Sequence, residues 1–200
     1  MKNIAILASG NGTNFEAIAK AVKTGRLKAN LKLLITDSEN AFVRERAKRF
    51  KVKDIFIDPK KFKNRVDFDK EIAKILKKEK IDLVVLAGFM RVLSSYFVRK
   101  FKNKILNIHP AILPAFKGVN TIEQAYNYGC KVTGVTIHFV DEKVDHGPII
   151  LQGVVKIKQG MSLKELEEKI HKLEHKLYPQ VIRLFLEGRI KVRGRDVKIT

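Results

Sequence analysis

The stretch NIAILASGNGTNFEAI, residues 3–18, decides the fold class. It begins with the short apolar run 4–8, passes through a loop with two glycines, and ends with apolar residues at helical spacing. A short and nearly continuous apolar run is typical of a strand in a parallel sheet that is covered on both faces. The stretch therefore predicts a strand, a tight loop and a helix, which together form the repeating unit of α/β proteins.

The same alternation continues through the first half of the chain. Further short apolar runs occur at residues 31–35, 55–57 and 83–87. Between them, Phe68, Ile72 and Leu76 repeat at the spacing of one helical face. Because crossovers between parallel strands are almost always right-handed, we expect an open, doubly wound, mostly parallel Rossmann-like sheet.

The second half of the chain predicts a less regular set of elements. We expect short helices near residues 94–101 and 121–128, strands at 104–109 and 149–157, and a more exposed strand at 131–140. Ser162 and Glu165 form a capping-box pattern that begins a long last helix, which Pro179 should kink or break. Residues 189–199 resemble a basic edge hairpin, and we interpret residues 1–200 as a single domain.

The composition excludes several classes of protein. In 200 residues, 45% are apolar and 31% are charged, which fits a globular chain and excludes a disordered or collagen-like one. The lone Cys130 excludes an internal disulfide and a cysteine-based metal cluster. The N-terminal apolar run is too short for a signal peptide or a membrane span, so we expect a cytoplasmic protein that does not interact with membranes.

The chain is strongly basic. It has 41 Lys and Arg residues against 21 Asp and Glu residues, a formal net charge of +20. Such a charge attracts anions, which include nucleic acid and small anionic molecules, but a solvated lysine-rich surface of a heat-adapted protein is an equal alternative. The lysines are scattered and form no arginine–aromatic motif, so nucleic acid is not the expected partner.

Residues 9–14, Ser-Gly-Asn-Gly-Thr-Asn, form a loop directly after the first strand. Glycines allow a ligand to approach the backbone, and the amides at a helix start favour an anion. Thr13 and Glu16 have the spacing of a cap for that helix. A dinucleotide fingerprint with Asp37 as its ribose ligand fits less well, because bulky Phe15 stands at the third glycine position. The loop suits a single phosphate better, with a plain strand–helix turn as the alternative.

Asn107 and His109 lie at the end of the expected strand 104–109. Alternate side chains of a strand share a face, and ligands of open α/β sheets bind at the carboxyl ends of the strands. An amide can donate to a developing negative oxygen and an imidazole can move a proton, so this pair suits carbonyl chemistry. A purely structural histidine is the alternative.

The segment 141–148, Asp-Glu-Lys-Val-Asp-His-Gly-Pro, is an acidic loop in a basic chain. A carboxylate in this loop could orient an imidazole and favour its charged form, although an ordinary turn is the alternative. His146 competes with His109 as the catalytic base, and the residues alone do not choose between them.

The segment His171-Lys-Leu-Glu174-His175 spells an inverted zinc-protease motif. A catalytic zinc site needs a further protein ligand, and only Glu187 and Asp196 remain downstream as candidates. We therefore reject the zinc interpretation and expect a solvated helix face.

Taken together, several ordered segments resemble the folate-dependent formyltransferase superfamily. Within it, the chain is similar to the family that formylates phosphoribosylglycinamide in purine synthesis. The resemblance covers nearly the whole chain and depends on residues 9–14, 85–93, 106–110 with Leu113-Pro114, and 134–148. It implies the formyltransferase fold and direct transfer of a formyl group from 10-formyltetrahydrofolate to the glycinamide amine, with neither a metal nor a covalent enzyme intermediate.

The resemblance also implies roles for individual residues. The catalytic trio is Asn107, His109 and Asp145, which favours His109 over His146. The glycinamide ribonucleotide side, with its ribosyl phosphate, is expected at Gly12, Thr13, Asn14 and Glu174. The folate side is expected at Arg65, Met90, Arg91, Val92, Leu93, Asn107, Asp141 and Val144.

The chain departs from the family pattern at two positions, and three rivals stay open. Ala111 stands where relatives commonly have serine, and Asn120 stands where many have histidine, which puts an auxiliary acid–base role there in doubt. The rivals are a formyltransferase acting on methionyl-tRNA, a formyltetrahydrofolate hydrolase and a non-catalytic nucleic-acid-binding protein. We expect the first two to carry an extra domain that this chain lacks. A homodimer is also left open.

Overall fold

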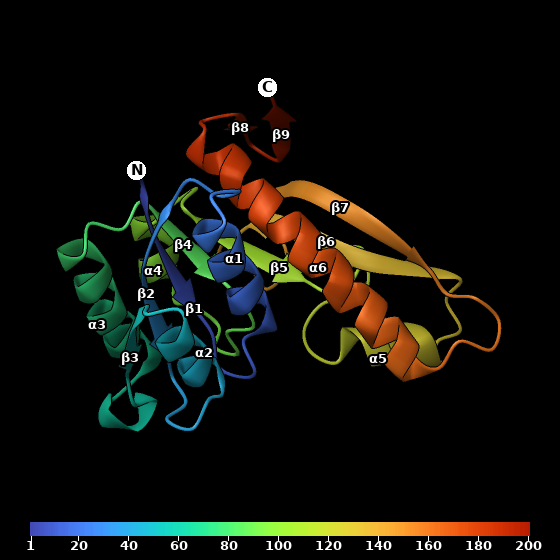
Figure 1. Ribbon diagram of the computed structural model, residues 1–200, viewed down its shortest axis with the longest axis horizontal. Coiled ribbons are helices and arrows are strands. Elements are labelled where there is room, and N and C mark those ends of the chain that lie inside the picture. The colour runs from blue at the N-terminus through green and yellow to red at the C-terminus, as the bar shows by residue number, and fades with distance from the viewer. The chain divides into compact units, whose positions relative to one another are not determined.

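A mostly parallel sheet of seven strands forms the centre of the computed structural model, which describes residues 1–200. The strand order is β3-β2-β1-β4-β5-β6-β7, and β8 pairs with β9 in a separate hairpin. The pairs β1–β2, β1–β4, β2–β3 and β4–β5 are parallel, whereas β6–β7 is antiparallel. The predicted α/β class and the mostly parallel sheet are thus confirmed (Figure 1).

The chain divides into two compact units, Met1–Asn107 and Ile108–Thr200, and the boundary falls within β5. The first unit contains, in order, β1 (Asn3–Leu7), α1 (Thr13–Lys23), β2 (Asn30–Thr36), α2 (Val43–Arg49), β3 (Lys53–Phe56), a 3-10 turn (Pro59–Lys61), α3 (Arg65–Lys78), β4 (Leu83–Leu86), α4 (Ser95–Lys100) and most of β5 (Ile105–His109). The second contains α5 (Thr121–Asn127), β6 (Val132–Phe139), β7 (Ile149–Lys156), α6 (Leu163–Leu186), β8 (Ile190–Arg193) and β9 (Asp196–Ile199).

The strand order of the first unit creates a topological switch point between β1 and β4. From β1 the chain adds β2 and β3 on one side, and then returns to add β4 and β5 on the other. Right-handed crossovers therefore place α1 and α2 on one face of the sheet and α3 and α4 on the opposite face. The loops after β1 and β4 leave the carboxyl ends of adjacent parallel strands, which is where such sheets bind ligands.

Burial explains why the central strands are continuous apolar runs. All of Ile4–Leu7 and all of β4 are buried, because helices cover both faces of the sheet at these strands. Phe15 and Ile18 of α1 are fully buried. On α3, Phe68, Ile72 and Leu76 are each at most 1% exposed. The helical spacing found in the sequence therefore marks the faces that pack on the sheet.

The second unit corrects two expectations. The strand expected to be more exposed is β6, yet seven of its eight residues are buried. It lies inside the sheet beside β7, and α6 lies along β6 and β7 (Figure 1). Gly153 of β7 makes the close approach possible, because a Cβ there would lie 2.6 Å from Leu177 Cδ1 of α6.

The long helix α6 contradicts one part of the expectation for Pro179, that it breaks the helix. The predicted capping box is present, with Ser162 and Glu165 bonded reciprocally. Pro179 does not break the helix, which continues to Leu186. Proline removes one backbone hydrogen bond, but Tyr178, Val181 and Ile182 around it are fully buried and hold the segment against the sheet.

Candidate active site

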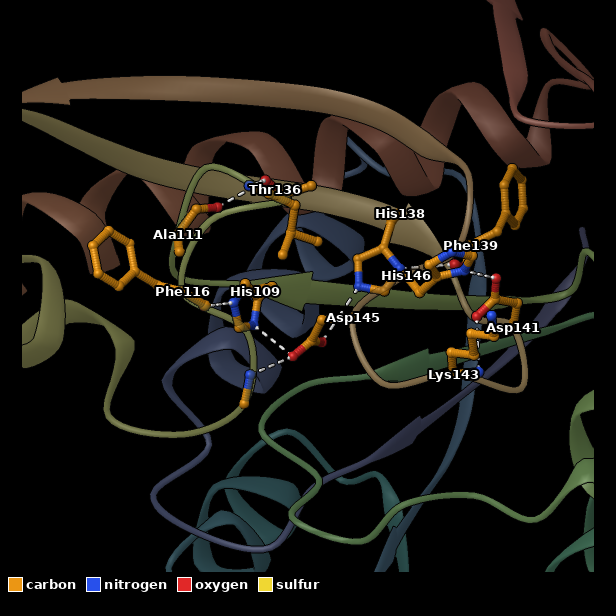
Figure 2. A network of polar contacts seen from close by, with 12 residues as sticks. His109, Ala111, Phe116, Thr136, His138, Phe139, Asp141, Lys143, Asp145 and His146 are labelled. Carbon is orange, nitrogen blue, oxygen red and sulfur yellow. Dashed lines mark hydrogen bonds and ion pairs between the residues drawn. The ribbon is translucent and has the colours of Figure 1, made fainter.

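His109 and Asp145 form a pair at the end of β5. The side chain of His109 is 4% exposed and that of Asp145 is 10% exposed, and His109 Nδ1 lies 3.4 Å from Asp145 Oδ2 (Figure 2). The other ring nitrogen, Nε2, donates to the carbonyl oxygen of Phe116 at 2.7 Å. A protonated ring donates from both nitrogens, so the imidazolium form satisfies both oxygens at once.

Asp145 is held from several directions. It lies in the loop between β6 and β7 with a φ of 46°, a conformation that is uncommon for a residue with a side chain. Its Oδ2 accepts from the backbone N–H of Gly118 at 2.9 Å, and its Oδ1 lies 3.7 Å from His138 Nε2. Burial alone would raise the pKa of Asp145, but the hydrogen bonds from His138 and Gly118 and the charges of His109 and His138 bring the pKa below its ordinary value.

His138 belongs to this cluster, and the sequence analysis assigned it no role. It lies at the end of β6, is 2% exposed, and directs Nδ1 to the carbonyl oxygen of Phe139 at 2.7 Å. The register of β6 against β7 shifts between Ile137 and His138. Such a shift changes the direction of a side chain, so simple alternation along β6 gave no reliable signal for His138.

His146, the other candidate base, has a different partner. Its Nδ1 lies 2.6 Å from Asp141 Oδ2, and its side chain is more than a third exposed. Figure 2 shows the two pairs, His109 with Asp145 and His146 with Asp141, as separate contacts. The structure therefore brings His109, and not His146, to the buried carboxylate.

Asn107 stands two residues before His109 on the same strand. It is half-buried, and its backbone is in register with Leu86 of β4. Because alternate residues of a strand share a face, the amide and the imidazole face the same side at the carboxyl end of β5. This placement suits an amide donor acting beside a proton carrier.

The glycine loop lies directly before α1, as expected, but the expected side-chain cap of that helix is missing. Gly12 is the residue before α1 and has a φ of 78°, and no side chain caps the helix. The expected cap by Thr13 is thus wrong, since Thr13 is already the first residue of the helix, and Glu16 pairs with Lys20 and Arg46. A side chain at position 12 would collide with Val43, because a Cβ would lie 2.3 Å from Val43 Cγ2. The close contact with Val43 therefore requires a glycine at the start of α1.

The segment 88–94 after β4 contacts the glycine loop. The N–H of Ser9 donates to Gly88 O at 3.0 Å, and the N–H of Met90 donates to Ser9 Oγ at 2.9 Å. Met90 and Val92 are 69% and 50% exposed, whereas Leu93 is buried. Two of the segments expected to bind substrates are thus joined at the switch point of the sheet.

Helix α3 supports the same segment. Asp69 is 1% exposed, and its carboxylate accepts from the N–H of Ser94, the cap of α4, at 2.5 Å. Burial raises the pKa of Asp69, although the bonds from Ser94 and the charges of Arg65 and Arg91 oppose the shift. The guanidinium of Arg91 lies 5.0 Å over the ring of Phe68, and Arg65 begins α3. Two cations and two exposed apolar side chains therefore occupy neighbouring positions in the first unit.

Glu174 lies on α6 and is 4% exposed. His171 Nδ1 lies 3.0 Å from Glu174 Oε2, and this hydrogen bond raises the pKa of His171. Burial and the charge of Glu174 raise the pKa of Tyr178 well above its ordinary value. His171 and His175 stack with their ring centres 6.5 Å apart, and no group of three or more His, Cys, Asp or Glu side chains is arranged to hold a metal ion.

The two positions where the chain departs from the family pattern have defined surroundings. The carbonyl oxygen of Ala111 accepts from Thr136 Oγ1 at 2.7 Å, and that hydroxyl accepts from the N–H of Leu113. Asn120 is exposed, has a φ of 55° and precedes α5 without a side-chain cap. Backbone contacts to Thr136 therefore hold the segment after His109 in place without a serine at position 111.

The expected site residues are shared between the two units. The first unit holds Gly12, Thr13, Asn14, Arg65, Met90, Arg91, Val92, Leu93 and Asn107. The second holds His109, Asp141, Val144, Asp145 and Glu174. Within the second unit, Asp141, Val144 and Asp145 lie in one loop, where Val144 is 49% exposed. No helix is both long enough and apolar enough to span a membrane.

Comparisons with known proteins agree on one group. The sequence profile described as "Formyl transferase" matches residues 2–182. The chain is 42% identical to phosphoribosylglycinamide formyltransferase of Bacillus subtilis, over 93% of this chain and 95% of that one. It is similar to the structure of glycinamide ribonucleotide transformylase 1 from Symbiobacterium toebii, with a TM-score of 0.97 and 43% identity over 100% of this chain and 94% of that one. The corresponding values for the Geobacillus kaustophilus structure of the same name are 0.90 and 47%, over 93% and 99%.

Proposed function

Since this chain belongs to the formyl transferase family, we propose that it transfers a formyl group from 10-formyltetrahydrofolate to the amine of N1-(5-phospho-D-ribosyl)glycinamide in purine (IMP) biosynthesis. The names of the similar proteins indicate the acceptor, and the family indicates a folate-derived donor. The observation that carries the proposal is the buried pair of His109 and Asp145 at the carboxyl end of β5, beside Asn107.

The three side chains divide the work of an acyl transfer. The amine nitrogen bonds to the formyl carbon, and the bond from that carbon to the donor nitrogen then breaks. Asn107 donates to the negative oxygen that develops at the carbon, and His109 stabilises this charge and carries the proton from the amine to the departing nitrogen. Asp145 holds the imidazole of His109, and its lowered pKa keeps the carboxylate ionised.

The acceptor is proposed to bind through its phosphate and its ribose. The N-terminus of α1, with Gly12, Thr13 and Asn14, suits a dianionic phosphate, because the dipole of a helix favours negative charge at that end. Glu174 is a buried carboxylate on α6 and would accept from hydroxyl or amine groups of the acceptor. Since the family profile matches residues 2–182, we propose that the two units serve one catalytic domain.

The folate donor is proposed to bind along segment 90–93 and the 140–148 loop. The exposed apolar side chains of Met90, Val92 and Val144 suit an aromatic pterin, and Arg65 and Arg91 suit the carboxylates of its glutamate. Asp141 and Asn107 supply polar groups for the ring. The donor supplies the activated formyl group, and the residues named here orient it and exclude water.

The setting of the enzyme is part of the proposal. We place it in the cytoplasm with small-molecule substrates, because one cysteine suits a reducing compartment and the similar proteins are named as enzymes. The methionyl-tRNA, hydrolase and nucleic-acid interpretations find no support in these names, and the structure provides no observation that favours them.

One assay tests the function directly. The protein is mixed with 10-formyltetrahydrofolate and, in separate reactions, with glycinamide ribonucleotide, methionyl-tRNA or water alone, and deformylation of the folate is followed. We expect rapid turnover with glycinamide ribonucleotide only. Comparable turnover with the tRNA, or with water alone, would contradict the proposal.

A further inference from the structure

The C-terminal hairpin lies beyond the residues that the family profile matches, yet it contacts the loop that carries Asp145. Strands β8 and β9 pair with Arg193 opposite Asp196, which leaves a turn of two residues, Gly194 and Arg195. Gly194 has a φ of 61°, as the first central residue of such a turn requires. This turn places Arg195 at the tip of the hairpin.

Arg195 makes a direct hydrogen bond to the 140–148 loop. Its guanidinium Nη1 donates to the backbone oxygen of His146 at 2.8 Å, and the same nitrogen lies 3.5 Å from His146 Nε2. His146 is the residue that follows Asp145. The contact therefore acts on the peptide group between His146 and Gly147, one residue after the proposed catalytic carboxylate.

The rest of the 140–148 loop is already held by its own contacts. The N–H of Phe139 donates to Pro148 O at 2.9 Å and closes the loop at its base. Gly147 is pressed against Phe139, because a Cβ there would lie 1.9 Å from Phe139 O. Asp141 binds the ring of His146 and accepts from the N–H of Lys143 at 3.0 Å. Arg195 adds a contact that connects this loop to the C-terminal hairpin.

Asp145 needs support of this kind. A residue other than glycine with a φ of 46° stays in that conformation only where its surroundings fix it. Its carboxylate is held from one side by Gly118, and the loop backbone is held at His146 O by Arg195. One contact thus holds the side chain of Asp145, and the other holds the backbone of the residue that follows it.

The hairpin is itself anchored at its base. The N–H of Arg189 donates to Leu184 O of α6 at 3.0 Å, and the N–H of Thr200 donates to Arg189 O at 2.9 Å. The side chain of Arg189 also binds the carbonyl oxygen of Thr200. The base of the hairpin is thus attached to the end of α6.

From these contacts we propose that Arg195 is a positioning residue, which holds the 140–148 loop so that Asp145 stays beside His109. The inference builds on the proposed formyl transfer for its kinetic consequence. It does not depend on that function for the structural consequence, which is the order of the loop.

The kinetic test compares Arg195→Ala with the matched control Arg193→Ala, which removes the same charge from an exposed position of the same hairpin. We expect Arg195→Ala to lower kcat about three- to tenfold, the scale of one exposed hydrogen bond from a charged donor. The KM for glycinamide ribonucleotide should change less than twofold, roughly, because the phosphate loop is untouched. Arg195→Lys keeps a cationic donor and should recover part of the lost turnover.

The structural test measures amide hydrogen exchange in the same variants. Exchange in residues 141–147 should rise in Arg195→Ala and stay at the wild-type rate in Arg193→Ala. Wild-type kcat and wild-type exchange in Arg195→Ala would overturn the proposal, as would an equal loss in the Arg193 control. A wild-type protein without formyl transfer would contradict the proposed function instead, and the exchange comparison would still decide the role of Arg195.

Discussion

Asp145 owes its charge to its neighbours. Burial of a carboxylate disfavours its ionised form, yet the pKa of Asp145 lies below its ordinary value because His138, Gly118 and His109 surround it. Asp145 in turn holds the imidazole of His109 at Nδ1, while the carbonyl oxygen of Phe116 holds it at Nε2. At the scale of single residues, the site is a carboxylate between two imidazoles.

Asp145 should therefore make folding stability depend on acidity. A carboxyl group whose folded pKa is lowered contributes stability that is present above its unfolded pKa of about 4 and is lost as the pH falls through the folded value. Urea unfolding of the wild type and of Asp145→Asn at a series of pH values measures this contribution. The difference in unfolding free energy should stay constant above about pH 5 and move against the wild type below about pH 4. A difference that does not change down to pH 2 would show that the surroundings of Asp145 do not favour its charge.

The elements of the fold begin where local chemistry permits. Helix α6 begins at a full capping box, α3 and α4 begin at Asn64 and Ser94, which accept hydrogen bonds from the backbone, and α1 begins at Gly12 with no side-chain cap. Helix α1, which like α2 and α5 has no side-chain cap, is the one proposed to receive the phosphate. The capping box of α6 satisfies backbone groups at its start and so serves stability.

Loss of the α6 cap should cost stability alone. Ser162→Ala removes the hydroxyl that accepts from the N–H of Glu165 and should lower the unfolding free energy by about 1 kcal/mol. Ser95→Ala is the matched control, because Ser95 is exposed in the first turn of α4 and is not the cap of that helix. Thermal and urea unfolding measure both variants. Equal stability of the Ser162 and Ser95 variants would contradict a role for the capping box.

Gly12 should be intolerant of any side chain. Gly12→Ala combines the cost of a left-handed backbone, roughly 1–2 kcal/mol, with a collision against Val43. Gly160→Ala is the control, since Gly160 has a φ of 77° and open space around its Cβ position. Unfolding measurements should show a larger loss for Gly12→Ala, and Val43→Ala added to it should recover little of that loss, because Val43 Cβ lies 2.5 Å from the Cβ position of residue 12 and alanine keeps it. Equal losses at the two glycines would mean that Val43 does not restrict the loop.

At the scale of the whole molecule, the formal charge of +20 should speed the arrival of anionic substrates. Both proposed substrates carry negative groups, a phosphate and a glutamate chain. We expect kcat/KM to fall as salt rises from about 0.05 to 0.5 M, because the Debye length shortens from about 14 to about 4 Å, and kcat to change less. Steady-state kinetics at several salt concentrations test this. A salt-independent kcat/KM would leave the charge without a role in substrate capture.

The parts of the fold that could be predicted from the sequence are those with a strong period. Four apolar runs and the α3 face gave the parallel sheet, but α2 has no such period and was not predicted. Strand β6 was expected to be more exposed because of the alternation in residues 131–140, a stretch that contains Thr133 and Thr136. Both are buried, and Thr136 satisfies its hydroxyl with backbone groups far along the chain.

The site was predictable to a similar degree. Alternation along one strand placed Asn107 and His109 on the same face, whereas the pairing of His109 with Asp145 is a contact between distant segments that only the resemblance indicated. His138 was missed because the irregular register of β6 redirects it. The contact of Arg195 with His146 joins residues 49 positions apart, so no local sequence pattern could predict it.

The central claim is that His109, held by Asp145, carries out formyl transfer. The most direct measurement is the turnover of purified, folded His109→Ala with 10-formyltetrahydrofolate and glycinamide ribonucleotide, both at saturating concentration. We predict a loss of at least about a hundredfold, the scale seen when one group that stabilises a developing negative oxygen is removed. Turnover close to that of the wild type in this variant would contradict the account.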